Sequence, residues 1–217
     1  MIFKNKNSKW KNDAGVTLVE VLVSVFLISI FSLIVVSDFP KMKRQFALSR
    51  ATYRLAQDIR RAEDLGLSGV QVKDEYGELI ESKGYGFYIN LSNNQKYYIY
   101  ADVSASQEEQ SVNHKYDNDN NYEECSSSST GDCIVEMTDI SAETPEVFIK
   151  QITTTLSSSW TDTSINFTPP NPTVIITVNS GGNTNIPTNV KIVLALKINE
   201  SITRTIDINS TGLIEVE

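Results

Sequence analysis

The sequence has little of what most catalytic sites need. Its 217 residues include a single histidine, His114. Without a histidine near a plausible nucleophile, a Ser-His-Asp or Cys-His arrangement has no support. The Gly-Tyr-Gly at 84–86 precedes a predicted strand instead of opening a helix, so it is not a phosphate-binding loop. The sequence therefore predicts that the protein is not an enzyme.

Positive charge is also scarce. The chain has 19 Lys and Arg against 27 Asp and Glu, and its formal net charge is −8. Nucleic-acid binders depend on Lys and Arg that neutralise phosphates. The composition therefore argues against nucleic acid as a general partner.

Cysteine is limited to Cys125 and Cys133, with Ser-Ser-Ser-Ser-Thr-Gly-Asp between them. In an oxidising compartment the simplest state for such a pair is a disulfide, and two free thiols are the alternative. A metal site is disfavoured because no further cysteine and only one histidine exist. We expect a disulfide.

One long run of the sequence has almost no charged residues. From Val16 to Val36 the residues are almost all apolar, and as a helix this run would cross the ~30 Å hydrocarbon core of a bilayer. No small-residue cleavage site stands before Asp38 and Pro40, so we expect an anchor that stays with the protein. Glu20 lies inside it. An unpaired carboxylate at bilayer depth costs on the order of 2.5 to 3.5 kcal/mol near the centre and less near an edge, so Glu20 needs a partner.

These N-terminal residues resemble a family. A leader with four lysines ends at Gly15 and is followed by Val16-Thr17-Leu18-Val19-Glu20 and the apolar run. This is similar to the N-terminus of type IV prepilins and type II secretion pseudopilins. The resemblance implies that a prepilin peptidase cuts between Gly15 and Val16. It also implies that Glu20, the fifth mature residue, attracts the free amine of a neighbouring subunit during filament assembly.

The family's commonest first mature residue is an N-methylated Phe, whereas this chain has Val16, so methylation is a weaker expectation than cleavage. The resemblance, and not the flanking charges, places the N-terminus in the cytoplasm. It implies a single pass through the inner membrane, a head outside the cytoplasm, and a periplasmic or cell-surface filament. The implied partners are other pilin or pseudopilin subunits, the prepilin peptidase, the inner-membrane assembly platform and membrane lipid.

A second helical pattern follows Pro40, which should interrupt or kink the helix. Apolar residues recur at spacings of three and four, and Gly66 and Gly69 should end the segment. The apolar stripe consists of Leu48, Ala51, Leu55, Ile59, Ala62 and Leu65. The other faces carry Lys41, Lys43, Arg44, Arg50, Arg54, Arg60 and Arg61. These basic residues either form a solvated face or meet anionic lipid head groups or acidic faces of neighbouring subunits.

From residue 85 onward the pattern alternates with period two, which is typical of strands. A hairpin is predicted from 86 to 102. Further strands are predicted at 133–138, 146–153, 163–167, 173–179, 190–198 and 202–208, the last two joined by Asn199-Glu200-Ser201. We expect an α+β fold in which a long helix, half membrane-spanning and half amphipathic, packs on an antiparallel sheet or sandwich. The predicted divisions are a cleaved leader at 1–15, a transmembrane and assembly helix at 16–37, an amphipathic helix at 38–66 and a β-rich head at 67–217.

The aromatic hairpin and the ending Thr-Arg-Thr-Ile-Asp-Ile-Asn-Ser-Thr-Gly also resemble the H-type minor pseudopilins and related minor pilins. The predicted function is that of a structural pilin or minor pseudopilin subunit. The alternative is a membrane-anchored binding module, an adhesin or a DNA-uptake pilin, whose head recognises a ligand.

One acidic loop could hold calcium. Asp117, Asp119 and Asn121 stand at alternate positions, with Glu123 behind them, and Ca²⁺ takes several converging oxygen ligands. An EF-hand is excluded because Tyr122 and Ser128 occupy the places that need Gly and Glu. A looser calcium loop and a plain solvated acidic loop both stay open, and no other cofactor is expected.

Overall fold

The computed structural model describes residues 15–73, 76–103, 115–116, 132–156, 159–169 and 173–217. Contacts divide the chain into two compact units, 1–43 and 44–217, which are described separately below. Helix α1 (Leu18–Ser68) contributes to both units. It contains both helical segments predicted from the sequence.

Two expectations concern the course of α1. Of the interruption or kink expected at Pro40, the interruption does not occur, because the apolar run before Pro40 and the amphipathic stripe after it both favour helix and one lost backbone hydrogen bond is tolerated. Gly66 does not end the helix but lies buried within it. The end comes at Gly69, whose φ of 59° is the left-handed conformation that glycine adopts easily after a last turn.

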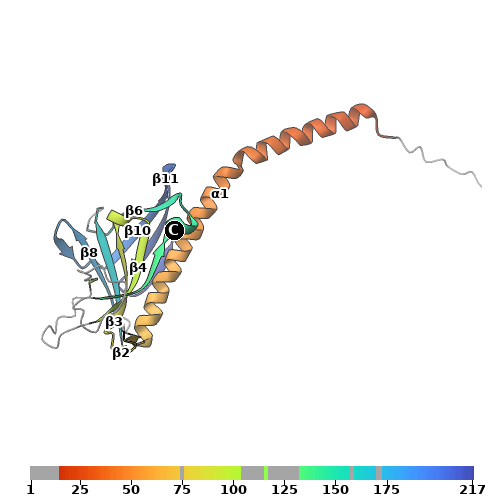
Figure 1. Cartoon of the computed structure of the whole chain (residues 1–217). Helices are drawn as coiled ribbons and strands as arrows, with labels where there is room; N and C mark the ends of the chain where they lie inside the picture. Colours follow the sequence, from red (N-terminus) through yellow and green to blue (C-terminus); the bar gives the residue numbers. More distant parts are fainter. Residues whose placement is uncertain (1–14, 74–75, 104–114, 117–131, 157–158, 170–172) are drawn as a thin grey trace, which may run out of the picture. The chain divides into compact units, whose positions relative to one another are not determined.

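The larger sheet of the head has six strands in the order β5-β4-β3-β7-β8-β9, all antiparallel. Figure 1 labels β3, β4 and β8 of this sheet. In chain order these are β3 (Gly84–Asn90), β4 (Lys96–Asp102), β5 (Cys133–Asp139), β7 (Asp162–Thr168), β8 (Thr173–Ser180) and β9 (Asn183–Asn185). A short 3-10 helix, Leu91–Asn93, makes the turn from β3 to β4. The aromatic hairpin predicted from the sequence is therefore confirmed.

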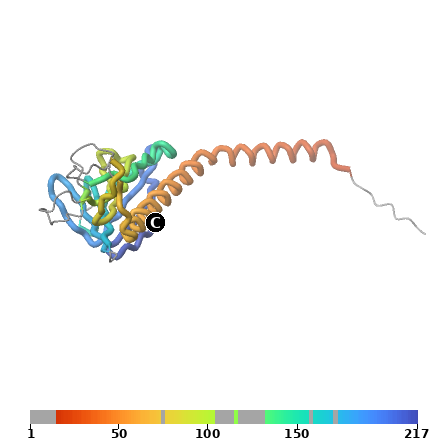
Figure 2. Tube along the Cα trace, turned by 60° about the horizontal axis from the view of Figure 1, so that its bottom comes forward, coloured from red at the N-terminus to blue at the C-terminus, as the bar shows by residue number. Residues whose placement is uncertain are grey.

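The second sheet has four antiparallel strands in the order β12-β11-β10-β6. They are β6 (Val147–Thr153), β10 (Asn189–Leu196), β11 (Asn199–Asn209) and β12 (Ile214–Val216). A small β1-β2 ladder (Val72–Lys73 with Leu79–Ile80) follows α1, and a one-turn helix α2 (Ile140–Glu143) joins β5 to β6. Figure 2 shows the chain's C-terminal strands, in blue, beside the orange part of α1, and Arg60 Nη2 donates a hydrogen bond to the Ile214 carbonyl at 3.1 Å.

One core lies between the two sheets and the stripe of α1. Leu55 and Ile59 of the helix are fully buried with Phe87 and Ile165 of the first sheet and Ile192 of the second. Five of the six stripe residues are buried and Leu65 is half-buried, because a β-rich head must cover its apolar faces with something. The predicted α+β architecture, with antiparallel sheets against an N-terminal helix, is confirmed.

The turn between the last two long strands differs from expectation. Asn199-Glu200-Ser201 belongs to β11, and the chain reverses at Lys197-Ile198, where Leu196 pairs with Asn199. A register shift next to Ala195 absorbs the extra residues of β11. The sequence pattern could not show this, because such an irregularity leaves the alternation on both sides intact.

Candidate assembly segment and the contacts of its helix

The predicted processing site precedes the start of α1. Residues 15–17 are not helical, and a side chain built at Gly15 would meet nothing within 4 Å. Thr17 caps the helix: its hydroxyl accepts a hydrogen bond from the Glu20 N–H at 3.2 Å, and its carbonyl accepts one from the Val21 N–H. Thr17 and Glu20 thus have the spacing of a capping box.

Glu20 lies in the first turn of α1. The first turn of any helix leaves backbone N–H groups without partners, and there the helix dipole favours a negative charge. That position lowers the cost of a carboxylate in an apolar segment but supplies no full positive charge. Glu20 is therefore at the end of the apolar segment where a further cationic group would be most useful.

The segment exposes an unusual amount of apolar surface. In the described part of the chain α1 contains an 18-residue window of mean hydropathy 2.8, none of it buried within the molecule. Phe26 is 65% exposed and Phe31 is 68% exposed. A surface this large and continuous requires lipid or other apolar helices to cover it.

The polar side chains within this apolar surface bond to their own backbone. The hydroxyls of Ser24, Ser29 and Ser32 each donate to the carbonyl four residues earlier, at 2.8 Å. In lipid such a bond satisfies a hydroxyl that would otherwise lack a partner. The serines are therefore compatible with a membrane environment, and Glu20 is the residue that is not.

Comparison with protein families addresses this segment. Residues 10–36 match a family model described as a prokaryotic N-terminal methylation motif. The chain is type IV pilin-like at its N-terminus. The motif supports a type IV pilin-type substrate of prepilin peptidase that assembles with other pilin subunits. With the one long apolar helix found among the described residues, it fits a membrane-anchored protein. No curated protein and no solved structure gives a significant match to the chain.

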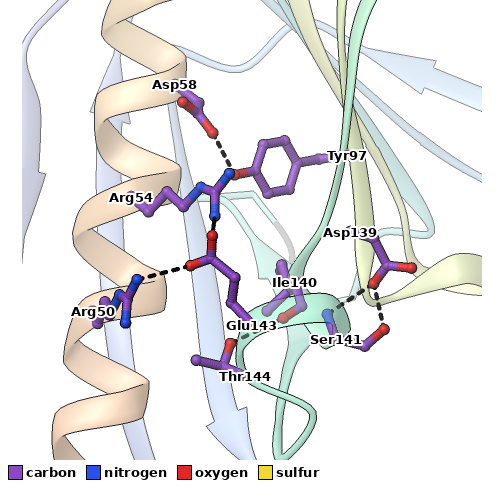
Figure 3. Close-up of polar contacts among 9 residues, drawn as sticks. All are labelled: Arg50, Arg54, Asp58, Tyr97, Asp139, Ile140, Ser141, Glu143 and Thr144. Atoms are coloured by element: carbon purple, nitrogen blue, oxygen red, sulfur yellow. Dashed lines mark hydrogen bonds and ion pairs between the residues drawn. The ribbon is translucent and has the colours of Figure 1, made fainter.

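Beyond the methylation motif, α1 binds the head through arginines. Arg50 and Arg54 both contact the carboxylate of Glu143 in α2 (Figure 3), the former at 3.2 Å. Arg44 Nε lies 3.3 Å from Glu146, and Arg61 lies 2.8 Å from Glu136. These pairs add carboxylates of the same chain as partners, which neither sequence-based interpretation named, while the arginine side chains stay partly exposed to solvent.

The ion pairs shift the pKa values of the groups involved. The hydrogen bond from Arg54 lowers the pKa of the Glu143 carboxyl, and Glu143 in turn raises the pKa of Arg54. Asp139, just before α2, accepts bonds from the N–H and hydroxyl of Ser141 (Figure 3), which lower its pKa. These shifts keep the carboxylates of the contact ionised at mildly acidic pH.

A partly buried hydrogen bond lies beside the arginines. The hydroxyl of Tyr97 in β4 donates to the Asp58 carboxylate of α1 at 2.5 Å (Figure 3). Burial, reinforced by this carboxylate, raises the pKa of Tyr97, so the phenol stays protonated and keeps donating. The sequence gives no sign of this contact, because neither residue departs from its local pattern.

The other predicted site residues are only partly covered by the structure. Asp117, Asp119, Asn121 and Glu123 lie outside the described residues, as does Cys125. Cys133 is buried at the start of β5. Within the described ranges no three His, Cys, Asp or Glu side chains converge as metal ligands would. The disulfide and the calcium loop stay predictions.

Proposed function

We propose that the protein is a structural subunit, a pilin or a minor pseudopilin, of a type IV pilus or a type II secretion pseudopilus. The observation that carries the proposal is the coincidence of two features in one segment. The methylation motif spans 10–36, and in the same residues α1 presents a fully exposed apolar surface with one carboxylate, Glu20, in its first turn. An H-type minor pseudopilin is the finer form of the proposal.

The mechanism is assembly through the helix. Cleavage between Gly15 and Val16 would create a new amine next to the helix start. In a filament that amine, from an adjacent subunit, would neutralise Glu20, while apolar helix surfaces cover one another. The pairing supplies the cation that the helix N-terminus alone does not provide.

The proposal includes a location and a direction. The leader would lie in the cytoplasm, α1 would cross the inner membrane once, and the head would lie outside until the subunit is drawn into the filament by the assembly platform. Lipid would cover the apolar segment before assembly, and neighbouring subunits would cover it afterwards. Membrane insertion and filament assembly would therefore use the same surface of the helix.

A Glu20→Ala variant separates these two steps. It should insert into the membrane as well as the unaltered chain or better, because it loses the costliest residue of the span. It should nevertheless form fewer subunit contacts. The measurement is cross-linking in cells that contain the assembly machinery, with a photoreactive benzoylphenylalanine at the exposed position of Phe26 and with cleavage verified by mass spectrometry in the same sample.

Two further variants make the result specific. Ser24→Ala removes a polar group of the same helix whose hydroxyl bonds only its own backbone, so cross-linking should be unchanged. Gly15→Leu should block cleavage. A Cβ at position 15 would meet no described residue within 4 Å, so a block would reflect recognition by the peptidase. If correctly cleaved Glu20→Ala gave as much cross-linked subunit as the unaltered chain, the assembly role assigned to Glu20 would be overturned.

A further inference from the structure

The outer face of the six-stranded sheet carries a row of large side chains away from the core. The register aligns Met137 of β5, Tyr98 of β4 and Tyr88 of β3 across neighbouring strands. Their sequence neighbours Phe87, Tyr97 and Ile99 point to the opposite face and are buried in the core. Tyr88 and Tyr98 are half-buried and Met137 is 47% exposed, so the row is open to solvent in the described part of the chain.

A third tyrosine from a remote segment completes the row. The ring of Tyr116 has its centroid 4.5 Å from that of Tyr88 and 6.3 Å from that of Tyr98, and it is almost parallel to the Tyr98 ring, with 4° between the planes. Its backbone N–H donates to the hydroxyl of Ser164 in β7 at 3.0 Å, which fixes Tyr116 over the sheet. We call Tyr88, Tyr98 and Tyr116 the tyrosine platform. The strands of the sheet position Tyr88 and Tyr98, and the bond to Ser164 positions Tyr116.

A hollow of about 700 Å³ opens at the tyrosine platform, within the size range of small-molecule sites. Its wall at the β3–β4 turn is formed by neutral hydrogen-bonding side chains, among them Asn90 and Ser92. Asn90 Nδ2 donates to the Tyr88 hydroxyl at 3.1 Å, which orients that ring. The hollow thus combines flat aromatic surface with amide and hydroxyl groups.

The two charged residues of the hollow are balanced by partners. Lys96 is opposite Asp139 in the sheet register, and it helps to lower the pKa of that carboxyl. Glu136 forms its ion pair with Arg61 of α1. Among the described residues that line the hollow there is therefore no excess charge of either sign, which favours a neutral ligand.

We propose that the tyrosine platform binds a neutral oligosaccharide. A pyranose ring has one apolar C–H face that stacks on an aromatic ring and a rim of hydroxyls that bond amides and hydroxyls, and the hollow provides both surfaces. A single-stranded nucleic acid also stacks on aromatic rings but needs a basic groove, and Lys96 is the one basic residue in the described lining of the hollow. This binding goes beyond the proposed filament role and does not depend on it.

The test measures binding of cellohexaose, chitohexaose and maltohexaose to the full chain in lipid nanodiscs by calorimetry. Nanodiscs avoid detergents with sugar head groups, which would compete for the site. At least one hexasaccharide should bind in the millimolar range or tighter, and Tyr98→Ala should weaken that binding about three- to tenfold. Tyr98→Phe keeps the ring and should retain most of the affinity.

Tyr53→Ala is the matched control, because this tyrosine is 56% exposed on α1 and is not part of the hollow. Its affinity should equal that of the unaltered chain, and thermal unfolding should show that all variants are folded. The proposal is overturned if none of the three sugars binds. It is also overturned if Tyr98→Ala binds as well as the unaltered chain, or if a polyproline peptide, the other ligand that suits an aromatic groove, displaces the sugar and binds more tightly.

Discussion

Gly66 has two opposing effects on the stability of the head, one through helix propensity and one through packing, and experiment can separate them. Glycine inside a helix is about 1 kcal/mol less favourable than alanine. In this chain, however, a Cβ at position 66 would lie 2.5 Å from the backbone oxygen of Phe167 in β7 and 2.8 Å from its Cβ. The absence of a side chain lets α1 approach the sheet, and backbone atoms on the opposing strand cannot rotate away as a side chain could.

Gly66→Ala should therefore destabilise the head by about 1 to 3 kcal/mol in spite of alanine's better helix propensity, because overpacking outweighs the propensity gain. Denaturant unfolding of the full chain in nanodiscs measures the change. Gln57→Ala, an exposed position of the same helix, is the control and should leave stability nearly unchanged. A Gly66→Ala head as stable as the original would show that helix and sheet are not in close contact at this point.

Single residues differ in how well the sequence reveals them. Glu20 is conspicuous because one carboxylate interrupts a long apolar run, and the structure places it in the first turn of α1. The partners of the arginines could not be predicted, since Arg50 and Glu143 are 93 residues apart and only the folded sheet brings α2 beside α1. A basic residue on a helix carries no local information about which carboxylate it will meet.

At the scale of elements, α2 is one turn long and contacts α1 through Glu143, which pairs with Arg50 and Arg54. Its Glu143 has a lowered pKa because of Arg54. A carboxyl whose pKa is lower in the folded state than its ordinary value of 4.5 stabilises the fold above that value, and the stabilisation is lost as the pH falls through the folded-state pKa.

Glu143→Gln should accordingly lower the melting temperature of the full chain at neutral pH, and the difference from the unaltered chain should shrink below about pH 4.5. Thermal unfolding across pH, followed by circular dichroism, measures it. Glu200→Gln serves as the control, since that carboxylate is 61% exposed and 3.8 Å from Lys150. A Glu143→Gln difference that stays constant down to pH 3 would contradict the assignment to this ion pair.

The elements themselves were largely predictable, because α1 and the long strands follow clear periods of 3.6 and 2. The tyrosine platform was not, because it combines Tyr88 of β3, Tyr98 of β4 and the remote Tyr116, which alternation alone does not bring together. A partial signal existed: Tyr98 and Tyr100 are two residues apart, so both point away from the core face that Tyr97 and Ile99 occupy. The pairing between strands decides which rings meet, and the sequence of one strand does not show which other strand it will pair with.

At the scale of the whole molecule, the oxidation state of the two cysteines indicates whether the head lies in an oxidising compartment. Cys133 is buried, so its resistance to alkylation would not by itself prove oxidation. Cys125 is the informative residue. In protein extracted from cells without reductant, Cys125 should resist alkylation until reduced, and in a Cys133→Ser variant it should label at once.

Peptide mass spectrometry after denaturation in the alkylating reagent reads each cysteine separately. The unaltered chain treated first with reductant gives the fully labelled reference. Complete labelling of Cys125 in the unaltered, unreduced chain would count against both the disulfide and an oxidising location.

The arginine contacts of α1 have a geometric consequence. Arg44, Arg50, Arg54 and Arg61 all reach carboxylates within the short stretch 136–146. Each helical residue turns the chain by roughly 100°, so one residue inserted between Arg54 and Arg61 would swing one group of arginines a quarter-turn or more away from these acids. Together with the buried apolar stripe, these contacts set one rotation of the helical segment 44–68 about its own axis within the head.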